Sequence, residues 1–176
     1  MFKIKNINAG LVIVKKINDD YYTLIGSNII DKKKVYKFSG GSYINLDKTA
    51  LHTAIRHFIE QIFNIKVSIT KIDEIAIEII KKKLLLNEYI YVPNIIMTYL
   101  GSFKTLNYIY KKLFNIKLNI YNFFKLRNKK MEYITKNKLA KISLSRINDL
   151  LITHTKFKRI TKLILFRIKT IFNIKL

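Results

Sequence analysis

The stretch Phe38-Ser-Gly-Gly-Ser-Tyr-Ile-Asn-Leu-Asp47, followed by Ala54-Ile-Arg-His-Phe-Ile-Glu-Gln-Ile-Phe-Asn-Ile65, decides the fold expected for this chain. Two adjacent glycines predict a turn, because glycine adopts backbone conformations that other residues avoid. The residues after the loop predict a helix from about Thr49 to Phe63, with Asp47 as its N-cap or first-turn acid. Apolar residues recur along it at a spacing of four, so we expect one broad buried face: Ala50, Ala54, Phe58 and Ile62.

The residues before the loop predict strands. Ala9–Val14 is a β-branched run that suits a buried strand, and Asn18-Asp-Asp20 suits a turn before a second strand at Tyr21–Ile25. Val35–Phe38 alternates like a strand that enters the glycine turn. Together these segments predict a hairpin and a third strand ahead of the helix.

After the helix, Lys66–Thr70 and Asp73–Lys83 are expected to be strands, because Ile75, Ile77 and Ile79 alternate. Tyr89–Val92 and Asn94–Leu100 flank Pro93, which argues against one continuous strand.

The C-terminal third changes character. Lys104–Lys130 mixes aromatic, Leu and Ile residues with Lys and Asn and predicts an inserted, partly helical arm. A short strand is expected at Glu132–Thr135, a helix at Lys136–Ile152, and a basic amphipathic helix from Lys156, with Phe157, Ile160, Ile164, Ile168 and Ile171 on one face. We therefore expect a domain over residues 1–152, with its insertion at about 104–130, and a terminal helix over 153–176. The thrice-occurring Phe-Asn-Ile-Lys, at Phe63, Phe114 and Phe172, is interpreted as compositional coincidence rather than as a repeat architecture.

The net charge is the second signal. The chain has 34 Lys and Arg against 11 Asp and Glu, a formal charge of +23, and 49% of its 176 residues are apolar. A charge excess of this size favours a polyanionic partner, with nucleic acid first and an anionic membrane surface second. A/T-rich codon usage offers another explanation, since Ile, Lys, Asn, Phe and Tyr dominate. The residues expected to contact RNA are Lys32, Lys33, Lys34, Lys81, Lys82, Lys83, Lys125, Arg127, Lys129, Lys130, Lys156, Lys158, Arg159 and Lys162.

Composition also excludes several kinds of site. The chain has no cysteine, so disulfides, thiol catalysis and thiolate metal sites are excluded. No apolar run reaches the length of about 18 residues that a membrane span requires. His52, His57 and His154 show no ligand spacing and are expected at the surface or in the core. No signal peptide or organelle presequence is visible.

The glycine loop and its helix resemble the motif of the Nudix hydrolases, in which a Gly-Gly loop precedes an Arg-Glu-x-x-Glu-Glu helix that holds magnesium. Here Arg56 and Glu60 match, whereas His57, Gln61 and Phe63 stand where that motif has two glutamates and a glycine. The resemblance implies a mixed-sheet α/β/α sandwich over about Ala9–Ile152. We expect no catalysis, no metal and no cofactor, with Glu60 the vestigial metal candidate and an Arg56–Glu60 ion pair as its ordinary role.

Two segments are more similar to a catalytically inactive Nudix-like family of the mitochondrial large ribosomal subunit. Lys48–Arg56 resembles that family's Glu-Thr-x-x-x-Thr-Ala-x-Arg, and Tyr133–Leu139 resembles its Val-Thr-Lys-Asp-Glu-Leu segment, with Asn137 and Lys138 in place of the acids. This resemblance implies a structural protein in the mitochondrial matrix whose partners are rRNA and neighbouring ribosomal proteins. It implies no small-molecule substrate and no membrane span.

Three alternatives remain open. One is a divergent Nudix hydrolase that acts on capped RNA or nucleoside diphosphate derivatives. The second is an RNA-binding factor outside the ribosome, which would stack bases on Tyr89, Tyr91, Tyr108 and Tyr110. The third is a protein that binds a membrane surface through its terminal helix.

Overall fold

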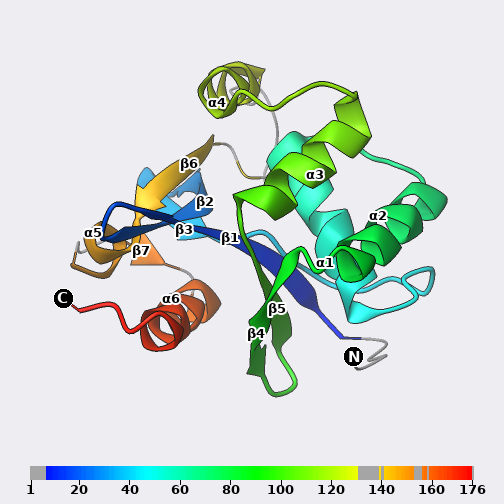
Figure 1. Cartoon of the computed structure of the whole chain (residues 1–176). Helices are drawn as coiled ribbons and strands as arrows, with labels where there is room; N and C mark the ends of the chain where they lie inside the picture. Colours follow the sequence, from blue (N-terminus) through cyan, green and yellow to red (C-terminus); the bar gives the residue numbers. More distant parts are fainter. Residues whose placement is uncertain (1–6, 131–138, 140, 153–155, 158, 176) are drawn as a thin grey trace. The chain divides into compact units, whose positions relative to one another are not determined.

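The computed structural model describes residues 7–130, 139, 141–152, 156–157 and 159–175. It shows a mixed α/β protein whose chain divides into two compact units (Figure 1). Unit 1 contains residues 1–13 and 39–118, and unit 2 contains residues 14–38 and 119–176. Strand β1 (Ala9–Ile17) runs from the first unit into the second.

Unit 1 is built on a three-stranded sheet that is covered by helices. The first residues of β1 pair in parallel with β5 (Ile96–Gly101), and β5 pairs antiparallel with β4 (Leu85–Val92). The helices are α1 (Ala50–Phe58), its π-helical continuation η1 (Ile59–Phe63), α2 (Ile69–Lys81) and α3 (Phe103–Phe114). Helices α1 and α3 lie against β5, and α2 contacts both of them (Figure 1).

The buried residues of unit 1 follow the expected helical face. Ala54, Phe58 and Ile62 each expose 1% or less of their surface, which confirms the predicted packing side of the helix over Thr49–Phe63. Thr49, and not Asp47, is the N-cap, because its side chain accepts a hydrogen bond from the backbone N–H of His52. The expectation for Asp47 was therefore wrong.

The strands expected at Lys66–Thr70 and Asp73–Lys83 were also wrong, because helix α2 begins at Ile69 and ends at Lys81, and Lys66–Ser68 belongs to no strand. Ser68 caps this helix by accepting from the backbone N–H of Lys71 at 3.2 Å. Ile75 and Ile79 are fully buried, whereas the intervening Ile77 is 55% exposed. The alternating isoleucines therefore do not all lie on one buried face. The buried residues of α2 follow the spacing of a helix instead: Ile72, Ile75, Ala76 and Ile79.

Unit 2 is built around β2 (Asp20–Ile30), which pairs antiparallel with three strands. These are the end of β1, β3 (Lys33–Lys37) and β6 (Lys141–Arg146); β7 (Lys156–Phe157) pairs in parallel with β3. The predicted hairpin is confirmed, since Ile17 pairs with Asp20 and Asn18 adopts a positive φ of 54° in the turn. Helices α5 (Ile147–Ile152) and α6 (Arg159–Ile171) lie side by side in this unit (Figure 1).

The C-terminal expectations are met in part. The predicted partly helical arm contains α3 and α4 (Ile120–Lys130), and the amphipathic terminal helix is α6, which buries Ile164 and Ile168. The expected start of that helix at Lys156 was wrong, because Lys156–Phe157 pairs with β3 as strand β7. The helix expected over Lys136–Ile152 was wrong for Lys141–Arg146, because that segment pairs with β2. The strand expected at Glu132–Thr135 lies outside the described residues.

Candidate functional site

The glycine loop of unit 1 lies directly against β1. Ala9 and Gly41 exchange two backbone hydrogen bonds of 3.1 Å, and Ser39 Oγ donates to the carbonyl oxygen of Leu11 at 2.8 Å. A Cβ atom on Gly10 would collide with the carbonyl oxygen of Ser39, and Gly40 adopts a φ of +152°. These contacts bring the loop backbone closer to the strand than a side chain would allow.

Asp47 closes the loop onto the helix. Its carboxylate accepts hydrogen bonds from the backbone N–H of Ile44 at 2.9 Å, from Thr53 Oγ1 at 2.8 Å, and from Arg56 Nε and Nη2 at 3.0 and 2.8 Å. The Asp47 side chain is 2% exposed and that of Arg56 is 10% exposed, so this is a buried ion pair. Arg56 Nη2 also donates to the carbonyl oxygen of Ser42 at 2.9 Å.

Burial and pairing act in opposite directions on these two groups. Burial alone would raise the pKa of Asp47, but hydrogen bonds from Arg56, Ile44 and Thr53, together with the Arg56 charge, lower it below its ordinary value. Burial would likewise lower the pKa of Arg56, and the hydrogen bond and charge of Asp47 raise it instead. Both side chains are therefore ionised at neutral pH and are held by each other.

Glu60, the vestigial metal candidate, takes part in the same network. Its Oε2 atom lies 3.7 Å from Arg56 Nη1, which confirms the predicted ion pair, and 3.9 Å from His57 Nδ1. His57 Nε2 donates to the carbonyl oxygen of Ser42 at 2.8 Å. The side chains that match the motif positions thus contact one another and the loop backbone.

Gln61 occupies the position of the second paired glutamate and binds the loop through both ends of its amide. Its Oε1 atom accepts from the backbone N–H of Gly40 at 3.0 Å, and its Nε2 atom donates to the carbonyl oxygen of Gly40 at 3.1 Å. A carboxylate has no proton to donate at neutral pH and could make only the first of these bonds. The sequence did not predict this role, which depends on the distance between helix and loop.

The described histidines also have structural surroundings. His52 is 4% exposed, and its Nε2 atom lies 3.1 Å from Asp73 Oδ1, while Lys48 Nζ contacts the other carboxylate oxygen of Asp73 at 2.5 Å. Burial is the main reason that the pKa of His52 lies below its ordinary value. Among the described residues, no group of three or more His, Asp or Glu side chains is arranged to hold a metal ion. His154 lies outside the described residues.

Two of the predicted lysine clusters lie at exposed turns, one in each unit. Lys32–Lys34 form the tip of the β2–β3 hairpin in unit 2 and the start of β3. In unit 1, Lys81 is the last residue of helix α2, and Lys82 and Lys83 form the turn that follows it. Lys34 Nζ lies 4.9 Å from the ring centroid of Tyr36, and Lys82 Nζ lies 5.9 Å from that of Tyr108. Each of these two ammonium groups lies over a tyrosine ring, and both lysines remain exposed to solvent.

The remaining predicted RNA-contact residues have different surroundings. Lys125 on α4, and Arg159 and Lys162 on α6, are exposed. Arg127 is 4% exposed, and its Nη2 atom donates to the carbonyl oxygen of Leu139 at 2.6 Å. Burial lowers its pKa to about 10. The side chains of Lys129, Lys130 and Lys156 lie outside the described part, as does the whole of Lys158.

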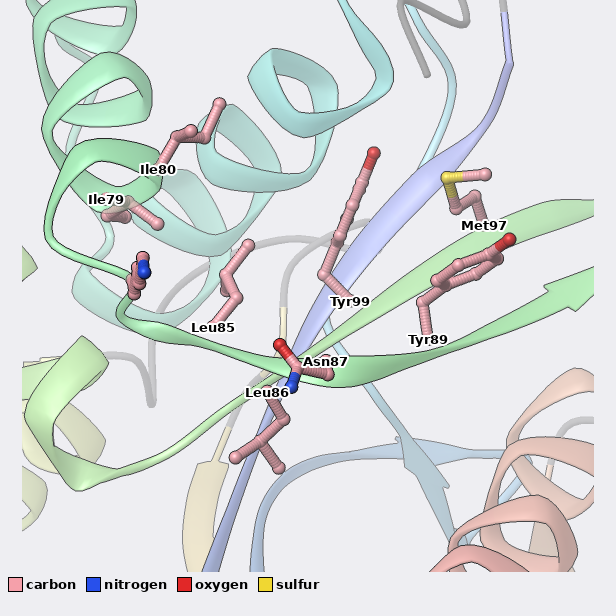
Figure 2. A pocket seen from close by; sticks show the side chains of 9 residues that line it. Ile79, Ile80, Leu85, Leu86, Asn87, Tyr89, Met97 and Tyr99 are labelled. Atoms are coloured by element: carbon pink, nitrogen blue, oxygen red, sulfur yellow. The ribbon is translucent and has the colours of Figure 1, made fainter. Parts of the chain in front are cut away.

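The structure adds one feature that the sequence did not predict, a hollow of about 310 Å³ in unit 1. It lies between the end of α2 and the β4–β5 hairpin, and Leu85, Tyr89, Met97 and Tyr99 extend from one side of that hairpin (Figure 2). Its other lining residues are Ile79, Ile80, Lys83, Leu86 and Asn87. Because Asp73–Lys83 was expected to be a strand, the wall that α2 supplies was not foreseeable, whereas the strand segments that carry Tyr89, Met97 and Tyr99 were expected.

Comparison with known proteins finds no match among family models, curated proteins or solved structures. Within the part of the chain that the structure describes, no helix is both long enough and apolar enough to cross a membrane.

Proposed function

We propose that this chain is a non-catalytic, Nudix-like protein that binds RNA phosphates through its exposed lysines, as a structural constituent of a mitochondrial large ribosomal subunit. The observation that carries the proposal is the exposure of whole lysine clusters in a chain of net charge +23. Lysine ammonium groups bind phosphate as point charges, so contacts of this kind position a protein on RNA without reading its sequence.

The loop–helix motif supports a structural role. In a working Nudix site several carboxylates must converge on magnesium. Here Asp47 is engaged by Arg56 and Thr53, Glu60 pairs with Arg56, and the position of the second paired glutamate holds the neutral Gln61, which binds Gly40. The motif residues therefore stabilise the loop. The element order from β1 through the glycine loop to α1 is compatible with the expected Nudix-like sandwich, and the ribosomal setting rests on the resemblance to protein forty-six of that subunit.

Sedimentation tests the proposal. The tagged full-length chain, expressed in its source cells, should co-sediment with the large ribosomal subunit from an organelle lysate at moderate salt. Changing Lys32–Lys34 and Lys81–Lys83 to Glu should weaken binding to rRNA at least tenfold and reduce its salt dependence, because each phosphate contact releases counterions. The same six positions changed to Arg keep the charge and form the matched control.

Two results would contradict the proposal. If the chain stays out of ribosomal particles at moderate salt, the ribosomal assignment is wrong. A magnesium-dependent release of nucleotide from capped RNA that disappears in the Glu60→Gln variant would establish the hydrolase alternative.

A further inference from the structure

Strand β4 forms one edge of the sheet in unit 1. It pairs with β5 along one side, and no described residue pairs with its other side. A free strand edge presents a row of backbone N–H and C=O groups that can pair with another chain. Proteins commonly protect such edges with charged side chains, proline or a covering element.

Large apolar side chains of β4 and of the end of α2 are exposed beside this edge. Tyr89 is 47% exposed, Tyr91 is 44% exposed, and Leu86 and Ile80 are 37% and 47% exposed. The strand register shifts between Leu85 and Tyr89, so the pairing with β5 is irregular beside the hollow. An apolar surface next to a strand with one unpaired edge is typical of a protein-interaction site.

The hollow lies on the face of the β4–β5 hairpin from which Tyr89, Met97 and Tyr99 extend (Figure 2). Tyr89 stands opposite Tyr99 in the register, and both side chains lie on this face (Figure 2). Tyr91 stands opposite Met97, so an added strand would lie beside these side chains. The walls are mainly apolar, with Ile79, Ile80 and Leu85 among the lining residues beside Tyr89 and Tyr99. Walls of this kind suit an apolar side chain.

Lysines flank the rim of the hollow. Lys83 lines it directly and has a positive φ of 52°, held by hydrogen bonds from Lys83 N to Ile80 O at 3.1 Å and from Leu84 N to Ile79 O at 3.0 Å. Lys81 and Lys82 precede it and are exposed. Glu88 is the acidic residue of β4, so positive charge predominates at the rim. A partner segment with acidic residues would be complementary to it.

We propose that β4 binds an extended, acidic segment of a partner protein by strand addition, with one apolar side chain of that segment in the hollow. This inference rests on the proposed function for its setting, because it specifies how the chain contacts a neighbouring protein. Strand addition supplies backbone hydrogen bonds, and the hollow supplies selectivity for one side chain.

A peptide-display selection on the isolated full-length chain tests this proposal without ribosomes or RNA. The probe is a library of random ten-residue peptides, followed by a synthetic, fluorescein-labelled consensus peptide. We expect a consensus that alternates apolar residues with Asp or Glu, binding in the micromolar range of weak strand-addition complexes. Bound peptide should slow amide hydrogen exchange within Leu85–Val92.

Variants locate the binding. Tyr89→Ser and Ile80→Ser remove exposed apolar side chains at the hollow without adding charge, and each should weaken peptide binding about tenfold or more. Ile77→Ser is the matched control, because Ile77 is also exposed on α2 but does not line the hollow. Circular dichroism confirms that each variant folds.

The proposal is overturned if no consensus is enriched or if the consensus peptide binds both hollow variants as tightly as wild type. It is also overturned if an RNA oligonucleotide, and no peptide, protects Leu85–Val92 from exchange. Because this assay contains no ribosomes, failed sedimentation with intact peptide binding would remove the ribosomal setting and leave the docking edge in place.

Discussion

At the residue scale, the loop–helix motif is explained by hydrogen-bond partners that a metal site would not use. Asp47 is surrounded by donors from Ile44, Thr53 and Arg56, and Gln61 binds both backbone groups of Gly40. The buried polar atoms of Asp47 and Gln61 thus have partners, which matters because leaving one such group unsatisfied costs about 1–3 kcal/mol. These hydrogen bonds hold the glycine loop against the helix.

The Gln61→Glu variant should lower the free energy of unfolding by about 1–3 kcal/mol at neutral pH, because a carboxylate cannot donate to Gly40 O and would face that oxygen. Urea unfolding measures the effect, which should diminish at acidic pH as the new carboxyl group becomes protonated. The isosteric control at an exposed position is Glu74→Gln, for which a change within about 0.5 kcal/mol is expected. A Gln61→Glu protein that is fully stable, or that gains stability on adding magnesium, would contradict this account.

At the scale of elements, asparagine ends helices in this chain. Each Phe-Asn-Ile-Lys copy supplies an asparagine with positive φ after a helix: Asn64 at 56°, Asn115 at 54° and Asn173 at 50°. Asparagine tolerates this left-handed conformation better than most residues, although glycine is the usual choice. The chain has five glycines, and asparagine instead of glycine stands at these three helix ends. The three copies thus share a local function without forming a repeat architecture.

Asn115→Val should destabilise the protein by about 1–2 kcal/mol, because a β-branched residue is strained at positive φ. Asn115→Gly should stay within about 0.5 kcal/mol of wild type. The matched control is Asn107→Val, an exposed position inside α3 where the two residues have similar helix propensities. Thermal unfolding of the three variants checks the prediction, and equal effects of valine at both positions would refute the capping role.

At the scale of the whole molecule, the charge is the dominant property. Thirty-four basic residues stand against 11 acidic ones, so basic side chains outnumber acidic ones about threefold. Most of the acidic residues that the structure describes form ion pairs, such as Asp73 with Lys48 and Asp20 with Arg146. The remaining positive charge repels itself in the folded chain and is relieved by screening or by a polyanion.

Raising the salt concentration from about 0.05 M to about 0.5 M should therefore raise the urea midpoint of the isolated chain, because the Debye length falls well below about 10 Å. A variant with Lys32, Lys33 and Lys34 changed to Glu should show a smaller rise, since its net charge is lower. A midpoint that falls with salt would mean that attractive ion pairs outweigh the repulsion.

Much of unit 1 and part of unit 2 follow from local sequence rules. The structure has the buried run of β1, the turn at Asn18, a strand at Lys33–Lys37 and the buried face of α1 where the sequence predicts them, although burial does not alternate along Val35–Phe38. These elements were predictable because the period of their apolar residues matches the geometry of the element that they form.

What the sequence by itself determined is this set of local elements, the charge, and the absence of cysteine chemistry. Tertiary structure decided the rest. It placed Ile75 and Ile79 on one face of a helix and paired Lys141–Arg146 with β2, because packing partners override weak local periods. It also brought Gln61 within hydrogen-bond distance of Gly40 and formed the hollow beside β4. Both features depend on contacts between residues far apart in the chain.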